Sequence, residues 1–154
     1  MKELLEYRAN LINRLVNVSH EFRDTCLAAT DAFATLDGGW NIHQIAAHTR
    51  DVDKLVYGLR ARRTAVEDNP EFPSFDGEAY IAEHYDSSES LSELLNGFVE
   101  SVQALVELLR ALPIAAWSRV SRHTTLGSGL TLLSWVEKDL AHIEEHLKTV
   151  KKTK

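Results

Sequence analysis

Apolar residues recur every three or four positions along four long stretches of the chain, and polar residues separate them. This spacing is typical of amphipathic α-helices that turn one face toward a core. The pattern predicts a first helix ending near residue 30, a second over 42–67, a third from Ser87 or Ser88 to Pro113, and a fourth beginning between Ser128 and Thr131. These four helices predict an all-α fold, an up-and-down, antiparallel four-helix bundle.

The connections between the helices contain glycines, prolines and aromatic residues. Residues 36–39 include two glycines, which favour a turn over a helix. The two prolines of 69–77 prevent a helix there, so we expect Phe72 and Phe75 to fold back over one end of the domain, in the core or in a pocket. A short helix is expected over 78–85. Residues 114–129 are predicted to form the longest irregular connection, a length that is typical of functional or disordered loops.

Composition restricts the class of protein. A length of 154 residues predicts one domain spanning 1–154, and the single cysteine, Cys26, excludes an internal disulfide and lies on the apolar face of the first helix. No apolar run is long enough for a signal peptide or membrane span, so we expect a cytoplasmic protein without a membrane partner. The net charge of −6 argues against nucleic acid as a partner, and the basic run 60–63 is interpreted as a solvated helix face.

The positions of the histidines on helical wheels distinguish them from one another. In the second helix His48 lies in the middle of the apolar face, whereas His43 and Asp53 point elsewhere, so His43 is interpreted as a surface residue. An unpaired imidazole in a core costs roughly 1–3 kcal/mol. His48 therefore needs a partner, which could be a carbonyl, a carboxylate or a metal ion.

The last helix carries a polar row about 90° from its apolar stripe. The row consists of Trp135, Asp139, His142 and His146. Two histidines four residues apart on a helix can converge on one ion. The pair lacks the zinc-protease motif, in which Glu follows the first histidine directly. In an antiparallel bundle His48 can face this row across the interhelical space.

Two motifs in this order resemble those of the DinB/YfiT-like four-helix bundle proteins. One is a tryptophan that opens the second helix with a histidine eight residues later, Trp40 to His48, and the other is a glycine-containing loop before a final HxxxH helix, Gly127 to His146. The resemblance covers nearly the whole chain in element order. It implies a divalent metal held by three histidines, and the matching positions are His48, His142 and His146. It also implies a homodimer.

Such a ligand set has recognisable chemistry. Three neutral imidazoles leave an exchangeable coordination position for water or substrate. The outer ring nitrogens need acceptors, for which Asp139 is the first expectation. Trp40, Trp135 and His123 are the other candidates for residues near the site. Imidazole ligands suit nickel and zinc, the metals we expect, and leave iron, cobalt and manganese open.

Two functional hypotheses follow from the sequence. The first is a metal-dependent enzyme with a small-molecule substrate, either hydrolase-like or a thiol-dependent transferase or isomerase. Its low-molecular-weight thiol is suggested by the resemblance, and its pocket would be closed by loops 72–75 and 117–123. The second is a non-catalytic metal-binding or stress-related bundle that acts as a dimeric interaction module. A fourth protein ligand would indicate the second, and an open coordination position the first.

Overall fold

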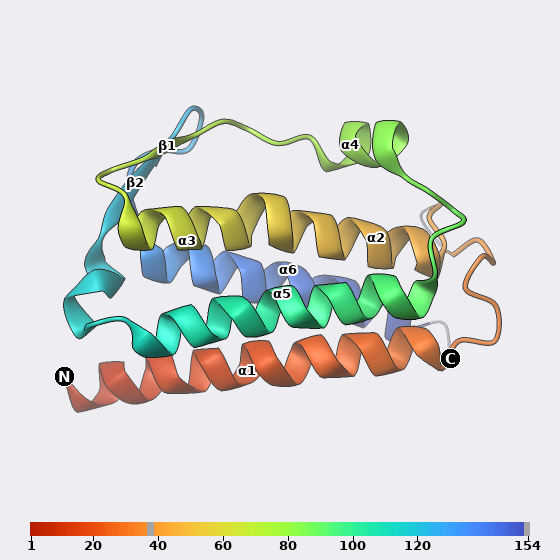
Figure 1. The fold of residues 1–154 in the computed structure, drawn as a ribbon, viewed down its shortest axis with the longest axis horizontal. Helices are drawn as coiled ribbons and strands as arrows, with labels where there is room; N and C mark the ends of the chain where they lie inside the picture. The colour runs from red at the N-terminus through yellow and green to blue at the C-terminus, as the bar shows by residue number, and fades with distance from the viewer. Residues whose placement is uncertain (37–38, 153–154) are drawn as a thin grey trace.

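The computed structural model describes residues 1–36 and 39–152, and its long helices form a four-helix bundle (Figure 1). The bundle consists of α1 (Lys2–Leu27), a continuous second helix made of α2 (Ile42–Val52), the π-helical turn η1 (Asp53–Tyr57) and α3 (Gly58–Val66), then α5 (Leu91–Ala111) and α6 (Leu132–Lys151). The predicted all-α four-helix bundle is confirmed. The expected short helix is α4 (Gly77–His84).

The connection between the second and third bundle helices runs back along the outside of the bundle. This crossover arm, residues 67–90, carries α4 and returns the chain to the end at which α2 begins (Figure 1). Helices α2 and α5 therefore run in the same direction, whereas a bundle with only short connections would alternate. Helix α1 and the second helix each pack against both α5 and α6.

A small three-stranded sheet lies at the other end of the arm. Strand β1 (Glu71–Phe72) pairs in parallel with β2 (Val120–His123), and β2 pairs antiparallel with β3 (Gly127–Thr131). The backbone of Phe72 is thereby tied to the segment that leads into α6. The sheet anchors the start of the crossover arm on the bundle.

The prediction that residues 114–129 are irregular is wrong. This segment contains the 3₁₀ helix η2 (Ile114–Ser118) and the β2–β3 hairpin. In β2 every second residue is buried, but the buried residues are Ser121 and His123. Because both are polar, the strand lacks the alternation of apolar and polar residues by which a sequence reveals a strand.

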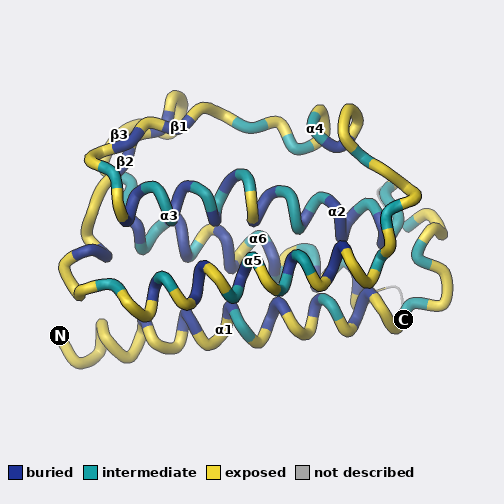
Figure 2. The backbone as a smooth tube through the Cα atoms, viewed as in Figure 1, coloured by how far each residue is buried: buried dark blue, intermediate teal, exposed yellow. Residues whose placement is uncertain are grey.

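The core lies between the four helices, and buried residues recur along them except over residues 2–7 of α1, which are exposed (Figure 2). Phe22 of α1 and Phe98 of α5 meet edge to face with ring centroids 5.5 Å apart. Burying side chains of this size contributes roughly 1.5–3 kcal/mol each. Cys26 is also buried, and burial raises the pKa of its thiol to about 12, which confirms its interpretation as a core residue.

The caps refine the predicted helix boundaries. Asn41 and Gln44 form a capping box at the start of α2, as the predicted opening of that helix requires. The third helix is capped by Ser90 rather than by Ser87 or Ser88. Two residues of the predicted glycine turn, at positions 37 and 38, lie outside the described residues. Within the described residues, every helix is too short or too polar to cross a membrane.

Three polar residues of the second helix are buried, contrary to expectation. The ring of His43 stacks on that of Phe33. Both of its nitrogens form hydrogen bonds with the crossover arm, Nδ1 with the Tyr85 hydroxyl (2.6 Å) and Nε2 with the Glu89 carbonyl (2.7 Å). Asp53 is buried at the π-helical turn, which shifts the helical register that the wheel assumed.

Arg60 contradicts the interpretation of residues 60–63 as a solvated face. Its guanidinium is buried and lies 4.9 Å from the centre of the Trp135 ring. Nη2 donates a hydrogen bond to the Pro73 carbonyl (2.9 Å). The crossover arm covers this side of the helix, and a wheel of one isolated helix could not reveal that.

Candidate metal centre

Three histidines from two helices meet beside the crossover arm. His48 projects from α2, and His142 and His146 project from successive turns of α6. Nε2 of His142 lies 3.2 Å from Nε2 of His48 and 3.0 Å from Nε2 of His146. Among residues 1–36 and 39–152, this histidine cluster is the one group of His, Cys, Asp and Glu side chains arranged to hold a metal ion.

The distances from Nε2 of His142 to the other two Nε2 atoms fit a shared ion, and all three ligand atoms lie within 4.8 Å of one another. Metal–imidazole bonds of about 2.0–2.1 Å place two ligand nitrogens about 2.9 Å apart at an angle of 90° and about 3.3 Å apart at the tetrahedral angle. The observed 3.0 and 3.2 Å fall between these values. Nitrogen lone pairs this close repel one another unless a proton or a cation lies between them, so the donor set matches what a divalent ion requires.

Burial keeps the cluster uncharged at neutral pH. Burial, together with the neighbouring imidazoles, lowers the pKa of His48 to about 4 and that of His142 to about 3. Burial also lowers the pKa of His146. The cause is that a cationic ring loses hydration inside the protein and meets a second ring that would also be positive. All three lone pairs are therefore available to an ion without loss of a proton.

An open cleft of about 600 Å³ borders the cluster on its outer side. His48 and His146 form part of its wall, together with Trp40, whose ring centroid lies 5.0 Å from that of His48. The opposite wall belongs to the crossover arm. It consists of Ser74, Phe75, Asp76, Gly77 and Glu78.

The two aromatic residues of the arm have different roles. Phe72 is buried in the core, where its ring meets Trp135 edge to face at 5.8 Å, and Phe75 lines the cleft. The other predicted closing loop is placed differently: Trp117 is buried, with the Arg8 guanidinium 5.3 Å from its ring centre. The prolines and aromatic residues of 69–77 indicated a loop that covers the bundle. Residues 76–78 were not identified from the sequence as part of the site, because nothing in their pattern reveals which helix they cover.

Asp139 and Trp135, which were expected in a row about 90° from the apolar stripe of α6, are both fully buried. The carboxyl group of Asp139 faces Asp53, and no hydrogen bond joins it to the histidine cluster in the described part of the chain. The Nδ1 atom of His142 is likewise buried without a partner there. The indole nitrogen of Trp135 donates to the Ser121 hydroxyl (2.7 Å).

His123 has a local role in the hairpin. Its Nδ1 accepts hydrogen bonds from the backbone nitrogens of Thr125 and Leu126, each 3.1 Å away. The side chain is buried. It also lies outside the group of side chains that could share one ion.

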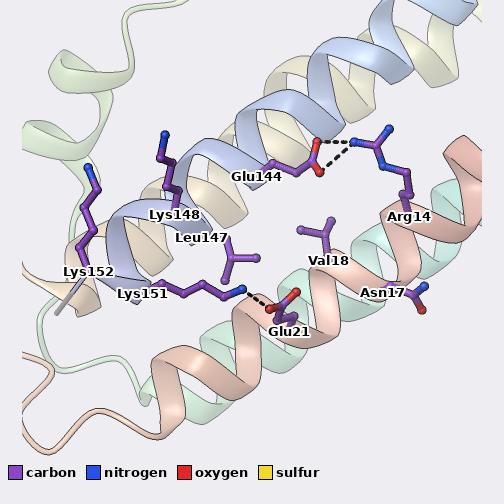
Figure 3. A pocket seen from close by; sticks show the side chains of 9 residues that line it. All are labelled: Arg14, Asn17, Val18, Glu21, Glu144, Leu147, Lys148, Lys151 and Lys152. Atoms are coloured by element: carbon purple, nitrogen blue, oxygen red, sulfur yellow. Dashed lines mark hydrogen bonds and ion pairs between the residues drawn. The ribbon is translucent and has the colours of Figure 1, made fainter. Parts of the chain in front are cut away.

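A second cavity, of about 640 Å³, lies in a groove between α1 and α6 (Figure 3). Ion pairs span this groove: Arg14 with Glu144 at 2.9 Å, and Lys151 with Glu21. Lys148 extends away from these pairs (Figure 3). No member of the histidine cluster lines the groove, and its ion pairs link α1 to α6.

Comparisons with known proteins agree with this architecture. The sequence model of the DinB superfamily matches residues 25–150. Among solved structures, the chain is similar to YfiT from Bacillus subtilis, described as a probable metal-dependent hydrolase with an unusual four-helix bundle topology. The TM-score is 0.84 at 23% identity, and the match covers 96% of this chain and 85% of that chain. A search of curated proteins finds no significant match. On the extent of the family match, this chain belongs to the DinB superfamily.

Proposed function

We propose that this protein is a divalent-metal-dependent enzyme that acts on a small molecule in the cleft beside His48 and His146. The observation that carries the proposal is the convergence of three Nε2 atoms at the wall of an open cleft. A cleft of about 600 Å³ lies within the range of small-molecule sites.

The ligand set favours catalysis over a purely structural ion. Structural zinc sites use four protein ligands, and the described residues supply three. When bound, a divalent ion would supply Lewis acidity and lower the pKa of a water molecule or thiol beside it. We propose nickel or zinc, because imidazole suits both; iron, cobalt and manganese are compatible with the same ligands.

The chain's own residues define what the site can accept. The three histidines would hold the ion, and Trp40 packs against His48 and limits its rotation. Phe75 and Trp40 offer apolar surface to a substrate, while Asp76 and Glu78 bring carboxylates to the same cleft. The substrate is bound between the arm and the bundle.

Two reaction classes are compatible with this arrangement. Hydrolysis is supported by the similarity to YfiT, whose description names a probable metal-dependent hydrolase. Transfer to a low-molecular-weight thiol is supported by the affinity of zinc, a borderline-soft ion, for thiolate sulfur. We further propose that the protein acts in the cytoplasm as a homodimer.

Metal analysis tests the proposal directly. The protein is purified without chelators or a metal-affinity tag, and its metal content is compared with that of His48→Ala. His20→Ala is the matched control, because His20 is exposed on α1. We expect close to one ion per chain in the wild type and the control, and a large loss in His48→Ala. Equal metal in all three proteins would contradict the proposed site.

Cobalt distinguishes the reaction classes. In the cobalt-substituted protein, a thiol that enters the open position produces a thiolate-to-metal absorption band. If no physiological thiol changes the spectrum, the thiol-dependent reaction is excluded and hydrolysis remains. An ion that merely holds the bundle together would bind neither thiol nor anion, and that result would favour the non-catalytic interaction module.

A further inference from the structure

Gly77, the first residue of α4, lies directly against the ring of His48. A Cβ atom placed on Gly77 would meet Cε1 of His48 at 2.8 Å and Nδ1 at 3.3 Å. The first distance is well inside the ordinary carbon–carbon contact of about 3.5–4.0 Å. At this position the arm and His48 touch so closely that a Cβ atom fits only if one of them shifts.

Backbone conformation does not account for this glycine. The glycines of the described residues with positive φ are Gly39, Gly127 and Gly129, so Gly77 does not occupy the left-handed region. The contact with His48 is therefore the structural reason for glycine at position 77.

The crossover arm is fixed on both sides of this contact, so it cannot move away freely. Before Gly77, Phe72 is buried and the Pro73 carbonyl accepts a hydrogen bond from Arg60. After it, the Tyr85 hydroxyl and the Glu89 carbonyl are bonded to His43. A clash between a side chain at position 77 and His48 would thus be relieved mainly by rotation of the His48 ring.

A second residue also contacts the ring. Trp40 lies against His48 with ring centroids 5.0 Å apart. His48 is therefore in contact both with a tryptophan just before α2 and with the backbone of the arm. Its Nε2 atom, 3.2 Å from that of His142, has its direction set by these two contacts.

From this geometry we infer that Gly77 is a positioning residue of the metal centre, through which the crossover arm sets the orientation of His48. The inference rests on the proposed metal site for its functional meaning. A larger residue at position 77 displaces Nε2 of His48 from the common point of the three ligands, and metal affinity falls although all three histidines are present.

The test compares Gly77→Ala with Gly97→Ala. Gly97 also lies in a helix, and a Cβ there would meet nothing within 4 Å, so the control adds the same methyl group without a clash. Two quantities are measured: the Cε1–H NMR signal of His48 in the metal-free protein, assigned with His48→Gln, and the dissociation constant for Co²⁺. Thermal unfolding of the metal-free variants reports on the fold.

We expect Gly77→Ala to move the His48 signal and to raise the Co²⁺ dissociation constant by about 10–100-fold, the effect typical of losing a residue that orients a ligand. Gly97→Ala should do neither. A signal that stays in place overturns the contact whether or not metal binds, and an unchanged dissociation constant in Gly77→Ala overturns the positioning role. If the wild type itself takes up no Co²⁺, the proposed metal site fails, while the NMR measurement still decides whether Gly77 orients His48.

Discussion

Replacing Asp139 by Asn should stabilise the protein above neutral pH. Asp139 of α6 and Asp53 of the π-helical turn are 0% and 1% exposed and face each other inside the bundle. Ser101 donates a hydrogen bond to Oδ2 of Asp53 (2.9 Å). Apart from the contact between the two carboxyl groups themselves, Oδ1 of Asp53 and both oxygens of Asp139 have no hydrogen-bond partner in the described part of the chain.

The direction of the pH dependence follows from the raised pKa values. Burial raises the pKa of Asp139 well above 3.8, the charge of Asp53 raises it further, and burial likewise raises the pKa of Asp53. The folded state therefore holds a proton that the unfolded chain releases. The contribution of this pair to the unfolding free energy is fully present below pH 3.8 and is lost as the pH rises through the folded-state pKa.

An amide at position 139 has no proton to lose and can donate to Oδ1 of Asp53. Leaving a buried polar group unsatisfied costs about 1–3 kcal/mol, so we expect Asp139→Asn to raise the unfolding free energy by about that amount at alkaline pH. For a chain of this length, this corresponds to a rise in Tm of about 2–4 °C per kcal/mol. The gain should shrink toward acid pH, where the wild type regains its proton.

Urea unfolding of the metal-free protein at about pH 5 and about pH 8 measures the effect, with chelator present so that bound metal does not contribute. Glu145→Gln, at an exposed position of the same helix, is the matched control. The reasoning would be refuted by an Asp139→Asn variant that is less stable than the wild type at pH 8, or by a difference that does not grow with pH.

Three further outcomes are expected. The metal-free protein should lose stability as the pH falls from about 6.5 toward 4. The pKa values of His48 and His142 are lowered to about 4 and about 3, so the unfolded chain takes up protons first. In urea unfolding, the free energy of His142→Gln should depend less on pH than that of the wild type. Ser121→Ala should cost about 1–3 kcal/mol by leaving the Trp135 indole without its acceptor, as thermal unfolding would show. The Cys26 thiol should react with a thiol reagent only after denaturation, since burial raises its pKa to about 12.

The histidine cluster shows how far a helical wheel can lead. The spacing of His142 and His146 placed both on one side of α6, and the position of His48 on the apolar face of α2 placed it inward. Both inferences depend only on the 3.6-residue period of an α-helix, which α6 keeps throughout and the second helix keeps up to the π-helical turn, beyond His48. The packing of α2 against α6, which brings Nε2 of His48 to 3.2 Å from Nε2 of His142, is a property of the bundle.

His43, Asp53 and Arg60 show where the same reasoning fails. A wheel assumes a regular helix with one face in solvent, but the second helix contains a π-helical turn and is covered by the crossover arm. The arm satisfies the polar groups that it buries, with the Glu89 and Pro73 carbonyls accepting from His43 and Arg60. A polar residue is thus no evidence of exposure when a distant segment supplies its partner.

The sequence by itself determined the four amphipathic helices, their apolar faces and the three histidines that point inward, because local periodicity and side-chain chemistry are written along the chain. Only the tertiary structure decided that residues 67–90 return along the bundle, that Gly77 lies on His48, and that Asp53 meets Asp139. These are contacts between segments far apart in the chain. They depend on how the helices pack together, which no single helix specifies.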